Sequence, residues 1–410
     1  MESAWYKKIG PGIVIAATGI GAGDLVAASV AGSKYGTVIL WSVLIGGLIK
    51  YSLNEGIARF QLASGETIVE AIKTRFHRIF GWYFLVYLLI WSFVVGAAMS
   101  GATGLAAHAI FPQLSVAWWG VIHALIALIF VFWGNYIWLE RGMKFFIALM
   151  FIVVISTAFL ITPDWSTILA GLLKPSIPEA SGTFLLGVIG GVGGSVTLLS
   201  YSYWIKEKGW VNANNFGLVK IDLAIAYSLT VLFGIAIIII SAELKPNIVQ
   251  GNSMVLALAE KVGETTGSTG KWLFLLGFWG AVFSSMLGVW QGVPYIFSDF
   301  VSTAASTKKQ NGVFYRLFQD KKQSYRLFLF FLALFPLFLL FTNKPVWIIV
   351  SYAVIGSFFM PFLAFTLIYL NNKKALIGIF KNNLIVNALL ILALVVFGVL
   401  LFEEISRFFF

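Results

Sequence analysis

Residues 19–24 read Gly-Ile-Gly-Ala-Gly-Asp, and they stand in the middle of an apolar run long enough to cross a membrane. An aspartate at the centre of a membrane helix costs roughly 2.5–3.5 kcal/mol to insert, so such acids usually face a cavity or a partner. Glycine tolerates non-helical backbone, which inside a membrane must be satisfied by protein, water or a bound ion. The alternative is close helix packing through small residues. With Asp24 beside them, these glycines favour a functional break in the helix.

A second glycine cluster, Gly190-Gly191-Val192-Gly193-Gly194-Ser195, interrupts another apolar run five spans later. Two interrupted helices in matching positions are typical of transporters built from inverted repeats, because a repeat with an odd number of helices reverses direction at each copy. In that architecture the substrate binds near the bilayer midplane, between the two breaks. The residues predicted to bind it are Gly21, Asp24, Gly194, Ser195 and, as a further oxygen ligand, Thr197.

The composition excludes a soluble protein. Of 410 residues, 60% are hydrophobic and 11% are charged, and the mean hydropathy is +0.92. The absence of cysteine excludes disulfides, thiolate metal sites and cysteine nucleophiles. Neither glycine cluster has the lysine and hydroxyl spacing of a phosphate-binding loop. No His, Cys or paired-acid constellation suggests an enzyme, and no cofactor is expected.

Apolar stretches of about 17–25 residues, the length that crosses a bilayer, predict an all-α integral membrane protein with eleven transmembrane helices. The predicted spans are Ile9–Ala31, Val38–Phe60, Ile79–Ala107, Val116–Phe132, Phe145–Ile161, Thr183–Trp204, Phe216–Ile240, Trp272–Phe300, Leu327–Phe341, Val346–Tyr369 and Leu384–Phe402. We expect a single transmembrane domain, with one five-helix repeat at about 9–161, a second at about 183–369, and an extra helix at about 384–402.

The basic residues orient the chain. The formal net charge is +11, but most of the 28 Lys and Arg lie in alternate loops between apolar runs, so they indicate membrane orientation and not nucleic-acid binding. A cytoplasmic N-terminus and an external C-terminus place most of them inside. We expect lipid and a small ion as partners and the plasma membrane as the location, while the sequence does not specify the oligomeric state.

Polar residues inside the second span allow two interpretations. Glu55 and Arg59 stand four residues apart, which predicts an ion pair near the cytoplasmic end of the helix. Alternatively, Lys50 or Glu55 lines an inner vestibule, or acts as a built-in countercharge or proton acceptor.

Several motifs along the chain share a pattern with one family of transporters. They are Gly10-Pro11-Gly12, Gly21 to Asp24, Ala31-Gly32, Tyr35-Gly36, Leu40-Trp41, Ile57-Ala58-Arg59, Ser64-Gly65, Leu139-Glu140, Ile221-Asp222, Ser284-Ser285 and Pro361-Phe362. In these residues the chain resembles the Nramp family of divalent-metal transporters, which belong to the LeuT-like superfamily. The resemblance implies a five-plus-five inverted repeat with broken helices 1 and 6.

The chain departs from that family at the residues expected to bind metal. Where the family carries Asp-Pro-Gly-Asn, this chain has Gly21-Ala22-Gly23-Asp24, so Asp24 takes the place of the asparagine. Where the family carries Met-Pro-His, it has Gly194-Ser195-Val196. A thioether suits softer transition metals and an all-oxygen site suits harder ions. The resemblance therefore implies a remodelled site, similar to that of Nramp-related magnesium transporters.

The family's proton-carrying groups are also replaced. Acids of its third helix fall near Ile90 and Phe93, and its sixth-helix histidine falls at Val196. The resemblance therefore leaves proton coupling open. Our leading hypothesis is a secondary transporter of a divalent cation that works by alternating access, with Asp24 as the charged metal ligand. The alternatives are a symporter of a small organic solute, such as an amino acid or amine, and a membrane sensor that has lost transport.

Overall fold

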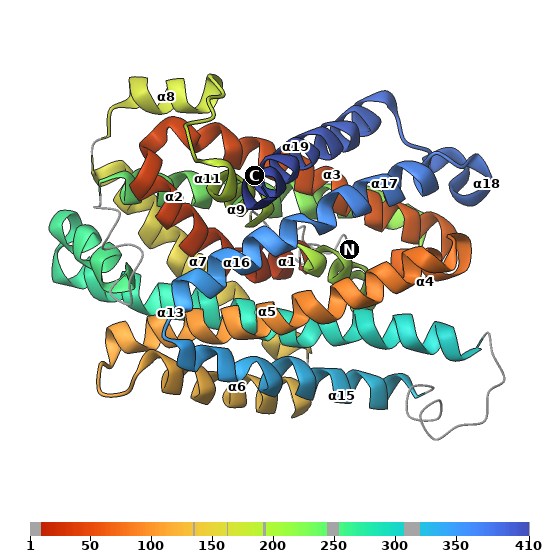
Figure 1. The fold of residues 1–410 in the computed structure, drawn as a ribbon, viewed down its shortest axis with the longest axis horizontal. Coiled ribbons are helices and arrows are strands. Elements are labelled where there is room, and N and C mark those ends of the chain that lie inside the picture. Colours follow the sequence, from red (N-terminus) through yellow and green to blue (C-terminus); the bar gives the residue numbers. More distant parts are fainter. Residues whose placement is uncertain are drawn as a thin grey trace, which may run out of the picture.

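The computed structural model describes residues 10–133, 136–161, 163–191, 194–243, 254–306 and 320–409, and every regular element in these ranges is a helix (Figure 1). Ten stretches of the described chain are long and apolar enough to cross a membrane. One of them, Leu25–Ser64, joins the last part of the first predicted span to the whole of the second. This continuity is why ten stretches correspond to eleven predicted spans.

The first transmembrane helix is broken, as predicted. Helix α1 (Pro11–Gly19) ends at the glycine cluster, and the chain resumes as the π-helix η2 (Ala22–Ala27) and the helix α2 (Ala28–Tyr35). Gly36, with φ of 67°, ends α2 in a conformation that residues with a side chain rarely adopt. The 3₁₀ turn η3 (Gly36–Ile39) then leads into α3 (Leu40–Ser64).

The next segments complete the first half of the chain. They are α4 (Ile68–Arg75), α5 (Arg78–Ile110), α6 (Val116–Trp133), α7 (Tyr136–Leu160) and α8 (Trp165–Leu173). Helix α7 begins nine residues before the predicted span, because its polar first turns continue the helix beyond the apolar stretch. The short helices α4 and α8 were not expected, since neither is long enough to span a bilayer.

The sixth transmembrane helix is also broken. Helix α9 (Gly182–Gly191) is followed by the 3₁₀ helix η4 (Val196–Ser200) and by α10 (Tyr201–Glu207). A 3₁₀ turn, η5 (Ala213–Asn215), then leads into α11 (Phe216–Ala242).

The remaining elements are α13 (Met254–Ser306), α15 (Lys321–Leu334), η6 (Phe335–Thr342), α16 (Pro345–Ser357), α17 (Phe359–Asn371), α18 (Lys374–Ile377), η7 (Gly378–Phe380) and α19 (Leu384–Phe409). Helix α13 is two helices joined at a kink at Gly267, and the predicted eighth span lies after that kink. Pro336 lacks an amide hydrogen, and the ninth span tightens from α-helix to 3₁₀-helix beside it.

The helices pack so that the breaks lie in the interior. Helices α5, α6, α13 and α15 contact one another and run alongside each other, while α11 packs on α2 and α3 (Figure 1). Large apolar side chains that face outward, such as Ile129, Phe338 and Val395, form the surface that lipid would cover.

Candidate functional site

At the first break, α13 approaches the backbone so closely that only glycine fits at position 21. A Cβ atom built on Gly21 would lie 2.2 Å from Cβ and Oγ of Ser285. The hydroxyl of Ser285 donates a hydrogen bond of 2.5 Å to the carbonyl oxygen of Thr18, in the last turn of α1. Ser285 therefore satisfies a carbonyl near the end of this helix. Gly21 lies where the sequence places it, at the break, and its neighbour Ser285 is a site residue that the site prediction omitted.

A thioether lies next to this break. The sulfur of Met99, on α5, is 3.5 Å from Oγ of Ser285, and the Met99 side chain is buried. Methionine in a membrane helix usually fills space, so nothing in the sequence distinguished Met99 from other buried residues. Its position places one thioether sulfur beside the first break.

At the second break, the backbone turns sharply at Gly194, which has φ of 89°. A Cβ atom built there would lie 2.3 Å from Oγ1 of Thr197, so the threonine hydroxyl lies directly over the glycine. Oγ of Ser195 and Oγ1 of Thr197 are both buried, and neither has a hydrogen-bond partner within the described part of the chain. Buried hydroxyls normally have a partner, so both oxygens could accept or donate a further interaction. Oγ of Ser195 lies near Gly356 on α16, while Oγ1 of Thr197 lies near Gly194.

Lys50 reaches the second break from α3. Its side chain is fully buried, and its ammonium group donates to the carbonyl oxygen of Gly190 at 2.8 Å and also to that of Gly194. These two carbonyls lie on opposite sides of the break. Lys50 thus belongs to the candidate site, together with Gly194, Ser195 and Thr197.

The two breaks are neighbours. The π-helix η2 contacts α9, and helix α1 contacts η4. The backbone of Asp24 forms part of η2, but its side chain lies outside what the structure describes, as do Val192 and Gly193. The role assigned to Asp24 therefore stays a prediction.

Glu55 has a different environment from Lys50. It forms the predicted ion pair with Arg59, one turn later on α3, and both side chains are buried. Arg59 also donates a hydrogen bond of 3.0 Å to the amide oxygen of Asn382, between η7 and α19. The local ion-pair interpretation is confirmed for Glu55.

A buried carboxylate holds the start of the first helix. Asp222, on α11, accepts hydrogen bonds from the backbone amides of Gly10 and Gly12 and from the hydroxyl of Tyr201. A Cβ atom on Gly12 would lie 2.5 Å from the backbone oxygen of Asp222, which explains the glycine. Asp222, on α11, therefore connects the start of α1 to α10, the helix that follows the second break.

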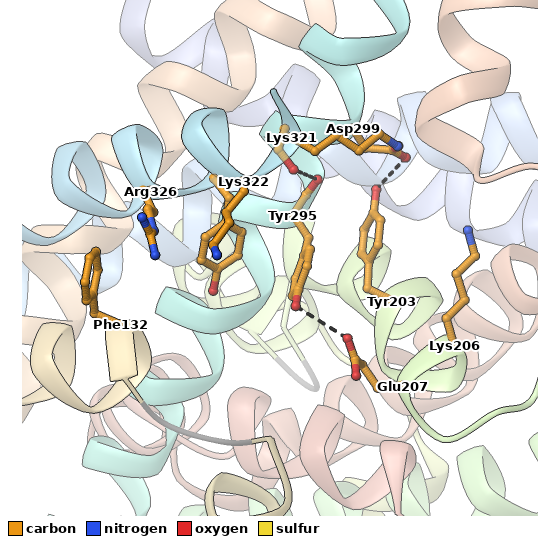
Figure 2. A pocket seen from close by; sticks show the side chains of 11 residues that line it. Phe132, Tyr203, Lys206, Glu207, Tyr295, Asp299, Lys321, Lys322 and Arg326 are labelled. Atoms are coloured by element: carbon orange, nitrogen blue, oxygen red, sulfur yellow. Dashed lines mark hydrogen bonds and ion pairs between the residues drawn. The ribbon is translucent and has the colours of Figure 1, made fainter. Parts of the chain in front are cut away.

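A separate cavity of about 490 Å³ lies between α6, α10, α13 and the start of α15, and none of the predicted site residues lines it (Figure 2). Its wall is aromatic and charged. Asp299 accepts hydrogen bonds there from Tyr203 at 2.9 Å and Thr67 at 2.7 Å, and pairs with Lys321 at 3.1 Å. The basic side chains that line the cavity are Lys206, Lys321, Lys322 and Arg326.

No group of three or more His, Asp or Glu side chains gathers in the part of the chain that was searched, namely the described residues. Among the side chains and backbone that the structure describes, the polar groups at the breaks are backbone carbonyls, hydroxyls, one ammonium and a nearby thioether. Carbonyl and hydroxyl oxygens are ligands that hard cations accept.

Two solved structures share the fold. The manganese transporter of Eremococcus coleocola aligns with a TM-score of 0.75 and 16% sequence identity, over 99% of this chain and 88% of the other. MhsT in complex with L-phenylalanine aligns with a TM-score of 0.58 and 15% identity, over 95% of this chain and 97% of the other. These likenesses establish the LeuT-like fold with its five-plus-five repeat and broken helices 1 and 6.

Sequence comparison identifies the family. A divalent metal cation transporter, MntH, from Nostoc sp. is 24% identical over 432 residues, covering 97% of this chain and 91% of the relative. The MntH of Chromohalobacter salexigens is 24% identical over 302 residues, covering 70% and 69%. The family model described as "Natural resistance-associated macrophage protein-like" matches residues 12–403. The chain is therefore an integral membrane protein of the Nramp family.

Proposed function

We propose that this protein is a secondary transporter that carries a divalent metal cation across the membrane by alternating access. The observation that carries the proposal is the second break, where the buried hydroxyls of Ser195 and Thr197 stand without hydrogen-bond partners among the described residues. Hydroxyl oxygens left unsatisfied beside an unwound helix are available to a cation. Family membership and relatives named as divalent metal cation transporters support a metal as the cargo, and they do not favour an organic solute.

In this proposal Asp24 is the charged metal ligand. Backbone carbonyls near Gly21, with the hydroxyls of Ser195 and Thr197 that follow Gly194, supply further oxygen atoms. Such a donor set suits a harder ion than the one favoured by a methionine-containing site. The ion is the substrate of the protein, and no resident cofactor enters the proposal.

The proposed orientation has the N-terminus in the cytoplasm and the C-terminus outside the plasma membrane, because most basic residues then lie inside. The proposed repeats cover about 9–161 and 183–369, with an extra helix at about 384–402. Metal uptake is proposed to proceed without the family's proton relay, since apolar Ile90, Phe93 and Val196 occupy the aligned positions.

Uptake into proteoliposomes tests the proposal. Purified protein is reconstituted, and uptake of Mn²⁺, Mg²⁺ and Ca²⁺ is measured for the wild type and for Asp24→Ala. Asp164→Ala is the matched control, because Asp164 caps the exposed helix α8, away from the breaks. We expect saturable uptake that Asp24→Ala abolishes and Asp164→Ala preserves. Folded wild type that takes up none of the three ions would overturn the proposal, and full uptake by Asp24→Ala would remove that residue from the site.

A further inference from the structure

We propose that the break in the sixth transmembrane helix is a cation site that the protein fills with its own ammonium group, that of Lys50. The transported ion then approaches from the Asp24 side and does not occupy the carbonyls of Gly190 and Gly194. The inference deepens the proposed function and rests on it only for the identity of the competing divalent ion.

The first step is the chemistry of the carbonyls. Helix α9 ends at Gly191, so the carbonyl of Gly190 belongs to the last turn, where no intrahelical amide is available. The carbonyl of Gly194 lies beyond the break, in backbone that is not helical. A helix C-terminus carries partial negative charge, and unwound carbonyls and half-helix C-termini are the groups that hold cations in transporters of this architecture.

The second step is the position of Lys50. An ammonium group has three donors and no acceptor, so toward carbonyl oxygens it acts as a small monovalent cation. The Lys50 side chain is fully buried in a membrane-spanning helix, where a charge is expensive unless it has a function or a partner. It contacts carbonyls on both sides of the break and therefore stands where a bound cation would bridge them.

The third step is the consequence for other ions. Two positive charges held close together repel each other strongly in a weakly polar interior. The ammonium group therefore weakens binding of any divalent ion nearby and makes an external monovalent ion at these carbonyls unnecessary. Wild-type protein should thus be indifferent to Na⁺, whereas protein without the ammonium group should bind Na⁺ at the break.

The test uses Lys50→Met, which removes the charge and keeps most of the side-chain volume, and Lys50→Arg, which keeps the charge. Lys220→Met is the matched control, because Lys220 is an exposed lysine on α11, where it lies over the ring of Phe216. The thermal unfolding midpoint of the purified full-length protein is measured in choline chloride and in NaCl at equal ionic strength, and then with MnCl₂ added. Mn²⁺ binding is measured by titration calorimetry.

We expect the midpoints of wild type, Lys50→Arg and Lys220→Met to be the same in NaCl and choline chloride. The midpoint of Lys50→Met should be lower in choline chloride, and NaCl or MnCl₂ should recover at least half of the loss. Its dissociation constant for Mn²⁺ should be about tenfold lower than that of the wild type, as expected when a nearby like charge is removed. If Lys50→Met is not recovered from membranes, Lys50→Gln should show the same response, because its amide group still donates to a carbonyl while carrying no charge.

A loss of stability in Lys50→Met that is equal in every salt would overturn the inference, because Lys50 would then be a structural cap of α9. Unchanged stability with no response to cations, or a wild type that Na⁺ stabilises as much as Lys50→Met, would overturn it as well. The Na⁺ readout does not depend on transport. A wild type that carries no metal would refute the proposed function while leaving the Na⁺ response to decide the role of Lys50.

Discussion

The carboxylate of Asp222 lies at the N-terminus of α1, where Oδ2 accepts a hydrogen bond of 2.5 Å from the backbone amide of Gly12. Its other oxygen accepts one of 3.1 Å from the amide of Gly10, and the hydroxyl of Tyr201 donates to Oδ2 at 2.9 Å. The first amides of a helix lack intrahelical partners, and a negative charge near them is stabilising. Asp222 therefore caps a helix from more than 200 residues away. Through the hydroxyl of Tyr201 it also links the start of α1 to α10, the helix that follows the second break.

Alternating access requires the segments around the breaks to move relative to the rest of the protein. We therefore predict that Asp222→Asn favours a conformation in which the start of α1 has separated from α11. The loss of hydrogen bonds to a charged group should lower stability by about 1.5–3 kcal/mol. The chain contains no cysteine, so a single introduced thiol reports on access without background. Ser200→Cys places the reporter in η4, buried in the wild type. Its labelling by a membrane-impermeant maleimide should become faster in Asp222→Asn.

The matched control for this experiment is Asp320→Asn. Asp320 caps the start of its own helix, α15, through the amide of Lys322. It should leave the labelling rate of the reporter unchanged. Equal labelling in Asp222→Asn and wild type, with both folded, would show that this cap does not restrain the conformation.

The close contact between Gly21 and Ser285 gives a second prediction. Gly21→Ala forces a methyl group against the Ser285 side chain, and overpacking of this kind typically costs about 1–3 kcal/mol. We expect a lower unfolding midpoint and slower metal uptake. Adding Ser285→Gly removes the obstructing atoms, so the double variant should regain part of the stability lost by Gly21→Ala. Gly142→Ala is the control, because a Cβ atom there meets nothing within 4 Å. Independent, additive effects of the two substitutions would contradict the proposed contact.

The sequence was sufficient to predict the features that arise from local composition. Both helix breaks are at the glycine clusters, because several glycines close together tolerate non-helical backbone that other residues would not. The pairing of Glu55 with Arg59 followed from their spacing on one helix. The apolar stretches located the membrane spans, although α7 and α13 extend beyond the predicted limits. A search for stretches of membrane-spanning length misses α4 and α8, because both helices are too short to cross a bilayer.

The partners that complete the site could not be predicted, because they come from distant parts of the chain. Lys50 contacts carbonyls 140 and 144 residues away, and Asp222 contacts amides 212 and 210 residues away. No local pattern shows that a lysine in one span faces the broken backbone of another. Met99 illustrates the same point, because its sulfur is near the first break only through the packing of α5 against α13.

The position of Met99 predicts an effect on metal selectivity. A thioether favours softer ions, so Met99→Leu, which nearly conserves volume, should weaken Cd²⁺ binding more than Mg²⁺ binding. We expect the Cd²⁺ dissociation constant to rise about tenfold, the lower end of the effect of altering groups around a metal site. Competition of Cd²⁺ and Mg²⁺ against Mn²⁺ uptake measures this ratio. Met150→Leu is the control, since Met150 is equally buried but packs against Gly277, eight residues before Ser285 on α13. An unchanged ratio would place the sulfur outside the reach of the ion.

The buried pair of Glu55 and Arg59 predicts a strong asymmetry between single and double substitution. Glu55→Gln leaves the Arg59 guanidinium group buried without its carboxylate, and breaking a buried pair in this way typically costs about 3–5 kcal/mol. Replacing both residues, by Glu55→Gln with Arg59→Leu, removes the uncompensated charge and should cost less than Glu55→Gln alone.

The exposed pair of Glu66 and Arg75 supplies the internal comparison, because its two side chains are about one third exposed. Surface pairs contribute roughly 0–1 kcal/mol, so Glu66→Gln should change the unfolding midpoint little. Arg59 also holds Asn382, so the single variant should in addition loosen the connection before α19, which hydrogen exchange at that segment would detect. If Glu55→Gln lowers the unfolding midpoint no more than Glu66→Gln does, other groups must compensate the charge of Arg59. The ion pair would then not be what holds the end of α3 against α19.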